Sequence, residues 1–159
     1  MIKLNFNIKH LLKSILPVLL AASIGTIFVI IDKINYDSLN KPFLNPPPYV
    51  FSIAWSIIYV LCIVAMYMFL DKVDNEETKQ KGVINYYINM FINLLWTVTF
   101  FGLGNFIAAL VLLILLYLST LSLFLIYRKE SKLVGNLIIP YLLWLLLALY
   151  LNICIVFLN

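Results

Sequence analysis

The sequence predicts an all-α integral membrane protein, a bundle of five transmembrane helices. Of its 159 residues, 64% are hydrophobic and only 11% are charged, whereas about a quarter of the residues of a soluble domain are charged. Five apolar runs of about 20 residues are each long enough, as helices, to cross a hydrocarbon core of about 30 Å. The predicted spans are residues 11–31, 50–70, 83–103, 105–127 and 137–157.

Helices are the consistent interpretation of these runs. Apolar β-strands rarely exceed about eight residues, and the strands of a membrane barrel alternate apolar with polar positions. The first run could be a cleaved signal peptide, since Lys3 and Lys9 precede it and residues 21–23 resemble a cleavage site. The apolar run nevertheless continues to Ile31, beyond an ordinary signal sequence. We therefore expect the first span to be retained.

Positive charges are divided unevenly between the two ends of the predicted spans. The N-terminal segment and the loops 71–82 and 128–134 together hold nine Lys and Arg residues, whereas the opposite end holds Lys33 and Lys41. Because basic residues are enriched on the cytoplasmic side, this predicts a cytoplasmic N-terminus, and the Lys-, Asn- and Ile-rich usage suggests a bacterial plasma membrane. The basic residues form no single patch, so we expect no nucleic-acid partner.

A single domain is predicted over residues 1–159, and its longest connection is the Pro- and Asn-rich loop 32–49. Cys62 and Cys154 fall inside spans, which argues against a disulfide framework or a thiol metal site. The one histidine, His10, lies near the N-terminus, and the sequence contains no catalytic motif. We therefore expect no metal and no intrinsic cofactor. No carboxylate lies well inside a span, so proton-coupled transport through a buried acid is unsupported.

Three predicted helices carry a polar or aromatic stripe. In the third span, Asn85, Asn89, Asn93 and Trp96 lie within about 80° of one another at 100° per residue. By the same arithmetic Trp55, Tyr59 and Cys62 share a face of the second span, and Tyr141, Trp144, Ala148 and Asn152 share a face of the fifth. Turned inward together, the stripes would line an aromatic cavity suited to a flat ligand. Alternatively, the Asn residues join helices by hydrogen bonds and the aromatic residues only pack.

Pairs of small residues four positions apart suggest close helix packing. Ala21 with Gly25, and Gly104 with Ala108, would let helix backbones approach in lipid. The pattern supports packing inside the bundle or a homodimer face, without choosing between them.

Three groups of residues follow one another along the loop and three spans. They are Lys41-Pro42, Pro46-Pro47, Phe51, Trp55 and Tyr59; then Asn93, Trp96 and Phe100-Phe101-Gly102; then Pro140-Tyr141, Trp144, Ala148 and Leu151-Asn152. These motifs resemble those of the TspO/MBR family, also called translocator protein or peripheral benzodiazepine receptor. The sequence departs from the family pattern where Asn35 and Leu44 replace tryptophans of the loop, and Leu110 replaces an acidic residue of the fourth helix.

The resemblance implies a five-helix bundle, often a homodimer, that lies in membrane lipid. It would bind porphyrins such as protoporphyrin IX and haem, as well as synthetic isoquinoline and benzodiazepine ligands. The implied ligand-binding residues are Tyr36, Pro42, Pro46, Pro47, Phe51, Trp55, Tyr59, Asn89, Asn93, Trp96, Tyr141, Trp144, Ala148 and Leu151. Some bacterial members are associated with light- and oxygen-dependent degradation of protoporphyrin IX, and the tryptophans implicated match Trp55 and Trp144.

Several functions remain open at this point. The protein could be a porphyrin receptor or sensor, an enzyme in which porphyrin is the substrate, or a transporter of porphyrin or lipid. A purely structural role would leave the polar stripes satisfied by neighbouring helices. The discontinuous helices and inverted repeats typical of transporters are not visible in five spans.

Overall fold

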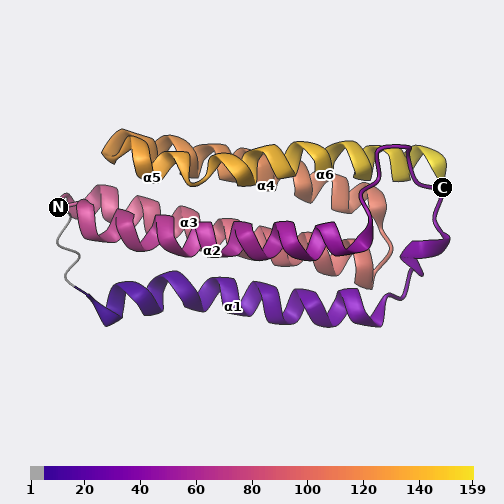
Figure 1. The fold of residues 1–159 in the computed structure, drawn as a ribbon, viewed down its shortest axis with the longest axis horizontal. Helices are drawn as coiled ribbons and strands as arrows, with labels where there is room; N and C mark the ends of the chain where they lie inside the picture. Colours follow the sequence, from indigo (N-terminus) through magenta and orange to yellow (C-terminus); the bar gives the residue numbers. More distant parts are fainter. Residues whose placement is uncertain (1–5) are drawn as a thin grey trace.

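The computed structural model describes residues 6–159, and within them five long helices lie side by side along one axis (Figure 1). Each is long and apolar enough to cross a membrane, which confirms the predicted all-α transmembrane bundle. In lipid only such helices satisfy their own backbone hydrogen bonds. The elements are α1 (Ile8–Ile31), η1 (Tyr36–Ser38), α2 (Pro48–Lys72), α3 (Glu76–Thr97), η2 (Val98–Gly102), α4 (Phe106–Glu130), α5 (Lys132–Asn136) and α6 (Ile139–Leu158).

The helices extend past the predicted spans at their charged ends. Helix α3 begins at Glu76 and α4 ends at Glu130, whereas hydropathy marked only residues 83–103 and 105–127. Hydropathy identifies the part of a helix that lies in hydrocarbon, but the backbone continues to form hydrogen bonds in the head-group region. The short helix α5 precedes the last predicted span, and α6 starts beside Pro140, a residue suited to the first turn of a helix.

Asparagine side chains cap the N-termini of three helices. The Asn7 side chain accepts hydrogen bonds from the backbone of Lys9 and His10 at the start of α1. Asn75 and Asn105 cap α3 and α4 in the same way. Such caps satisfy backbone N–H groups that have no partner within the helix. The frequent Asn residues between the apolar runs therefore help to fix where the spans begin.

Helices α3 and α4 form an antiparallel hairpin and pack along their length. The turn between them contains Gly104, whose φ of +64° favours glycine. Farther along, the Asn85 side chain donates to the Ser122 hydroxyl (2.7 Å) and the Asn89 side chain to the Thr120 hydroxyl (2.8 Å). These two asparagines thus join α3 to α4.

The end of the bundle away from η1 is closely packed. The Phe69 ring is stacked on the Tyr127 ring at a centroid distance of 4.3 Å, and both side chains are fully buried. The Tyr86 hydroxyl donates to the backbone oxygen of Ser14 (2.9 Å), which ties α3 to α1. Gly82 leaves the space that the Phe69 ring fills, since a Cβ there would lie 2.3 Å from that ring.

Candidate functional site

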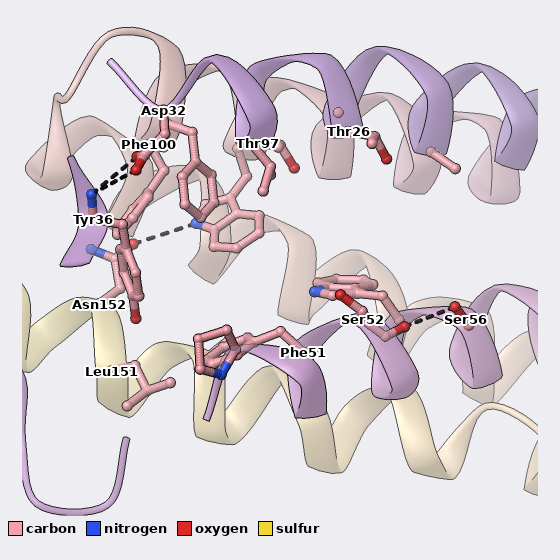
Figure 2. A pocket seen from close by; sticks show the side chains of 18 of the residues that line it. Thr26, Asp32, Tyr36, Phe51, Ser52, Ser56, Thr97, Phe100, Leu151 and Asn152 are labelled. Atoms are coloured by element: carbon pink, nitrogen blue, oxygen red, sulfur yellow. Dashed lines mark hydrogen bonds between the residues drawn. The ribbon is translucent and has the colours of Figure 1, made fainter. Parts of the chain in front are cut away.

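A cavity of about 580 Å³ lies inside the bundle at the end where the loop between α1 and α2 crosses over (Figure 2). Its walls come from α1, α2, α3, η2 and α6, and its mouth from residues of the loop. The lining residues are Ala22, Gly25, Thr26, Val29, Asp32, Tyr36, Asp37, Pro48, Phe51, Ser52, Trp55, Ser56, Tyr59, Trp96, Thr97, Phe100, Phe101, Ala148, Leu151, Asn152 and Ile155.

Aromatic rings form the deeper wall. Trp55 of α2 lies 6.2 Å from Trp96 of α3 and 5.4 Å from Tyr59, measured between ring centroids. The planes of each pair are inclined by 34°. Phe100 and Phe101 continue the wall from the π-helical segment η2. A flat apolar ligand could therefore stack on rings that come from two different helices.

Asparagines form hydrogen bonds with these rings and with their neighbours. The Tyr59 hydroxyl donates to Asn93 Oδ1 (3.2 Å), and Asn93 Nδ2 donates to the Tyr141 hydroxyl (3.1 Å). The Trp96 indole N–H donates to Asn152 Oδ1 (3.4 Å). Because these polar groups already have partners, the deep part of the cavity presents mainly ring faces. Its asparagines position the rings and do not crowd the space.

Hydroxyl groups line the side of the cavity that lies between α1 and α2. Thr26 projects from α1, and Ser52 and Ser56 project from α2 on the other side (Figure 2). All three side chains are exposed. The Ser56 hydroxyl donates to the backbone oxygen of Ser52 (2.7 Å). This edge of the cavity is the more polar one within the spans.

The loop that covers the mouth is hydrogen-bonded to itself around Tyr36. Both carboxylate oxygens of Asp32 accept from the Tyr36 backbone N–H (3.0 Å each), and the Tyr36 hydroxyl donates to Asn45 Oδ1 (3.0 Å). The Lys41 ammonium lies 4.9 Å from the centre of the Tyr36 ring. Burial, together with the nearby Asp37 carboxylate, raises the pKa of the Tyr36 hydroxyl above its usual 10.0. Tyr36 is therefore a neutral donor at ordinary pH.

The structure brings half of the sequence-predicted ligand residues to the cavity surface. Those that line it are Tyr36, Phe51, Trp55, Tyr59, Trp96, Ala148 and Leu151. Asn93 and Tyr141 lie behind the wall, and Trp144 lies behind Phe51, with its ring edge-on at 5.6 Å. These three act on the cavity only through the residues in front of them.

Other predicted residues lie away from the lining. The polar stripe of α3 contacts more than one neighbouring helix. Asn89 is fully buried against α4, and only the end of the stripe at Trp96 reaches the cavity. Cys62, from the predicted stripe of α2, is likewise fully buried in the packed core. Pro42, Pro46 and Pro47 are in the loop but do not line the cavity; Pro47 caps the start of α2.

Sequence reasoning missed the contribution of α1. Ala22, Gly25, Thr26 and Val29 follow a helical i, i+3, i+4, i+7 pattern and form one wall. The signal was present as small residues, which we interpreted as close helix packing or a homodimer face. Ala21 is buried and Gly25 faces Thr97, so this pair lies inside the bundle, whereas Gly104 falls in the α3–α4 turn. The acidic residues Asp32 and Asp37 at the mouth were also missed.

Comparison with known proteins gives a consistent result. Residues 14–158 match the TspO/MBR family. The chain is 32% identical over 154 residues to the tryptophan-rich protein TspO of Archaeoglobus fulgidus, covering 96% of this chain and 99% of that protein. It is 33% identical over 124 residues to TspO of Chlorobaculum tepidum (78% of each chain), and 32% identical over 117 residues to the tryptophan-rich sensory protein of Cereibacter sphaeroides (74% and 72%). The chain belongs to the TspO/MBR family of membrane proteins.

Proposed function

We propose that this protein is a membrane receptor that binds a porphyrin, such as protoporphyrin IX or haem, in the cavity between α1, α2, α3 and α6. The supporting observation is the pair of indole rings, Trp55 and Trp96, 6.2 Å apart on the cavity wall. The volume of about 580 Å³ falls within the range of about 300–1,000 Å³ that small-molecule sites occupy. Flat isoquinoline and benzodiazepine compounds would use the same ring faces.

Charges at the mouth suggest how a porphyrin would be oriented. Asp32 and Asp37 line the mouth and would repel the ligand's carboxylates. Lys41 lies over the Tyr36 ring and donates to the backbone oxygen of Asp37 (2.9 Å), so its ammonium is close to the same opening. The macrocycle would enter the aromatic part of the cavity, and its carboxylates would remain near Lys41 and water.

Titration of the detergent-solubilised protein with protoporphyrin IX in the dark tests this proposal. Binding is followed by the porphyrin's visible absorbance, which stays comparable when a tryptophan is replaced. We expect saturable binding, weakened roughly 2- to 10-fold by Trp55→Phe, since aromatic pairs contribute about 0.5–1.5 kcal/mol beyond buried area. Trp144→Phe is the matched control, because Trp144 does not line the cavity, and its effect should be smaller. Absence of saturation with the wild type would refute the porphyrin assignment.

A second candidate function is light-dependent oxidation of the bound porphyrin. Trp55, Trp96 and Tyr59 are oxidisable rings at the wall on which the porphyrin would lie. The porphyrin itself absorbs the light and dioxygen is the oxidant, so the protein supplies orientation and nearby rings. We expect illuminated wild type to convert porphyrin in air but not under argon, and Trp55→Phe/Trp144→Phe to lose conversion while still binding. If the wild type and the double variant converted porphyrin equally, the binding proposal would stand and the catalytic proposal would be refuted.

We further propose that the protein is a homodimer in the bacterial plasma membrane, with its N-terminus in the cytoplasm. The support for this orientation is the excess of Lys and Arg at the end of the bundle opposite the cavity; of these, Lys3 lies outside the described residues. The cavity mouth would then face away from the cytoplasm. In intact cells, an impermeant maleimide should label Lys33→Cys but not Lys129→Cys. The reverse labelling would invert the topology.

A further inference from the structure

Two asparagines join the loop over the cavity to the end of α6. The backbone N–H of Asn40 donates to Asn159 Oδ1 (2.9 Å), and Asn159 Nδ2 donates back to the backbone oxygen of Asn40 (3.1 Å). Asn40 Nδ2 also donates to the backbone oxygen of Leu158 (3.2 Å). We refer to these three hydrogen bonds as the Asn40–Asn159 clasp. It joins residues 119 positions apart at the end of the bundle where loop and α6 meet (Figure 1).

The clasp is the polar attachment of the loop to a distant helix. Among the described residues, the other hydrogen bonds made by residues 33–46 stay within the loop and its flanking ends. The remaining contacts with the helices are apolar, chiefly the Tyr36 ring against Phe100 and Phe101. Releasing the clasp would therefore leave the loop held by apolar packing alone, that of the Tyr36 ring and of Ile34 and Leu39.

The residues of the clasp do not line the cavity, but the clasp connects two segments that do. The loop carries Tyr36 and Asp37 at the mouth, whereas α6 supplies Ala148 and Leu151 to the wall. The hydrogen bonds of the clasp are exposed, and removing one such bond shifts an equilibrium by roughly 2- to 10-fold. A set of weak bonds of this kind suits a loop that must open and close repeatedly.

We propose that Asn159 is a positioning residue which, through Asn40, holds the loop over the cavity mouth and limits how fast a ligand enters and leaves. The identity of that ligand rests on the proposed porphyrin function. The attachment of the loop by the clasp does not depend on that proposed function, because the hydrogen bonds of the clasp are made within the protein. Since the clasp leaves the ring wall unchanged, its loss should accelerate association and dissociation together and change the affinity little.

Variants of the clasp can be graded by the hydrogen bonds they remove. Asn159→Ala removes two bonds of the clasp and Asn40→Ala removes one, because the other two use the backbone of Asn40. Asn159→Asp keeps the acceptor for the Asn40 N–H and should behave as an intermediate variant. Asn136→Ala is the matched control, since this exposed asparagine accepts from Arg128 at the opposite end of the bundle.

Two measurements on the full chain in detergent decide the proposal. Hydrogen–deuterium exchange of residues 33–46 without ligand should rise roughly 5- to 30-fold in Asn159→Ala and roughly 2- to 10-fold in Asn40→Ala, with no change in Asn136→Ala. Stopped-flow mixing with protoporphyrin IX should show both rate constants rising by similar factors while the Kd changes less than about 2-fold.

The possible contrary results are distinct. Unchanged exchange of residues 33–46 in Asn159→Ala would overturn the clasp. Faster exchange with unchanged porphyrin rates would overturn its control of entry and indicate another route. If wild type fails to bind porphyrin, the proposed function fails, and the exchange experiment still decides whether Asn159 holds the loop.

Discussion

Gly82 and Gly25, at opposite ends of the bundle, differ in whether a neighbouring ring fills the space beside them. At the closely packed end, Gly82 of α3 leaves a space that the Phe69 ring fills, and that ring is itself stacked on Tyr127. At the cavity end, the nearest atom to a Cβ on Gly25 of α1 would be the methyl group of Thr97, at 3.5 Å. Missing side chains make room at both ends. A cavity exists only where no neighbouring ring occupies that room.

The largest expected effect is on the packed end. In Gly82→Ala the new Cβ would lie 2.3 and 2.4 Å from two ring atoms of Phe69, which cannot move because the ring is fully buried and stacked. Overpacking of this kind costs about 1–3 kcal/mol. We expect a clear fall in the Tm measured in detergent by labelling of Cys62, a fully buried thiol, with a maleimide dye.

Gly25→Ala is the control for that measurement. Its Cβ makes ordinary contacts, and replacing a helical glycine with alanine removes a propensity cost of about 1 kcal/mol. We expect an unchanged or slightly higher Tm. If Gly25→Ala lowered the Tm as much as Gly82→Ala, the contrast between a filled and an open end would be wrong.

A second pair of variants separates stability from binding. Asn89→Leu removes two hydrogen bonds between α3 and α4 at a residue outside the cavity lining, whereas Asn93→Leu removes the acceptor of Tyr59, a residue of the cavity wall. Each should lower the free energy of unfolding by about 0.5–2 kcal/mol, because interhelical hydrogen bonds in membranes are modest. Only Asn93→Leu should also weaken porphyrin binding, by releasing the Tyr59 ring.

Thermal unfolding and porphyrin titration of the same two preparations check this prediction. Equal losses of affinity would mean that the asparagine stripe acts as one unit, and that the division between a cavity wall and an α3–α4 contact does not hold.

The fold could be predicted almost completely from the sequence, because length and hydropathy alone require five helices in lipid. Helix ends were less accurate: α3 starts at Glu76, seven residues before the predicted 83, inside a charged segment that hydropathy excludes. The Asn75 cap explains this start. A cap signal of this kind is readable in the sequence, whereas the π-helical end of α3 at η2 is not.

The site could be predicted only where aromatic residues mark it. Trp55, Tyr59 and Trp96 were found because rings on one helix face are conspicuous, and they do line the cavity. Asn89 illustrates the limit, since helical periodicity gives a face but not which neighbour that face meets. The cavity wall formed by α1 was missed for a related reason. Gly25 contributes to this wall because it has no side chain, and the sequence does not show whether a neighbouring residue fills the space beside a glycine.

The smallest expected effect concerns Tyr36 at the cavity mouth. Tyr36→Phe removes the hydrogen bond to Asn45 but keeps the ring against Phe101, so porphyrin binding should weaken by no more than about 0.5–1.5 kcal/mol. The pKa of Tyr36 is raised by burial and by Asp37. A raised pKa means that the folded protein favours the protonated phenol. The stabilisation of the folded state by this phenol is therefore complete below the unfolded pKa of about 10 and is lost as the pH rises through the folded pKa.

Loop closure should accordingly be independent of Tyr36 ionisation between about pH 6 and pH 9. The tyrosinate absorbance of wild type minus that of Tyr36→Phe, recorded during alkaline titration, isolates this one phenol from the others. We expect this phenol to titrate above pH 10.0. Titration below that value would place Tyr36 in water, and the loop would then not be closed over the cavity as the structure has it.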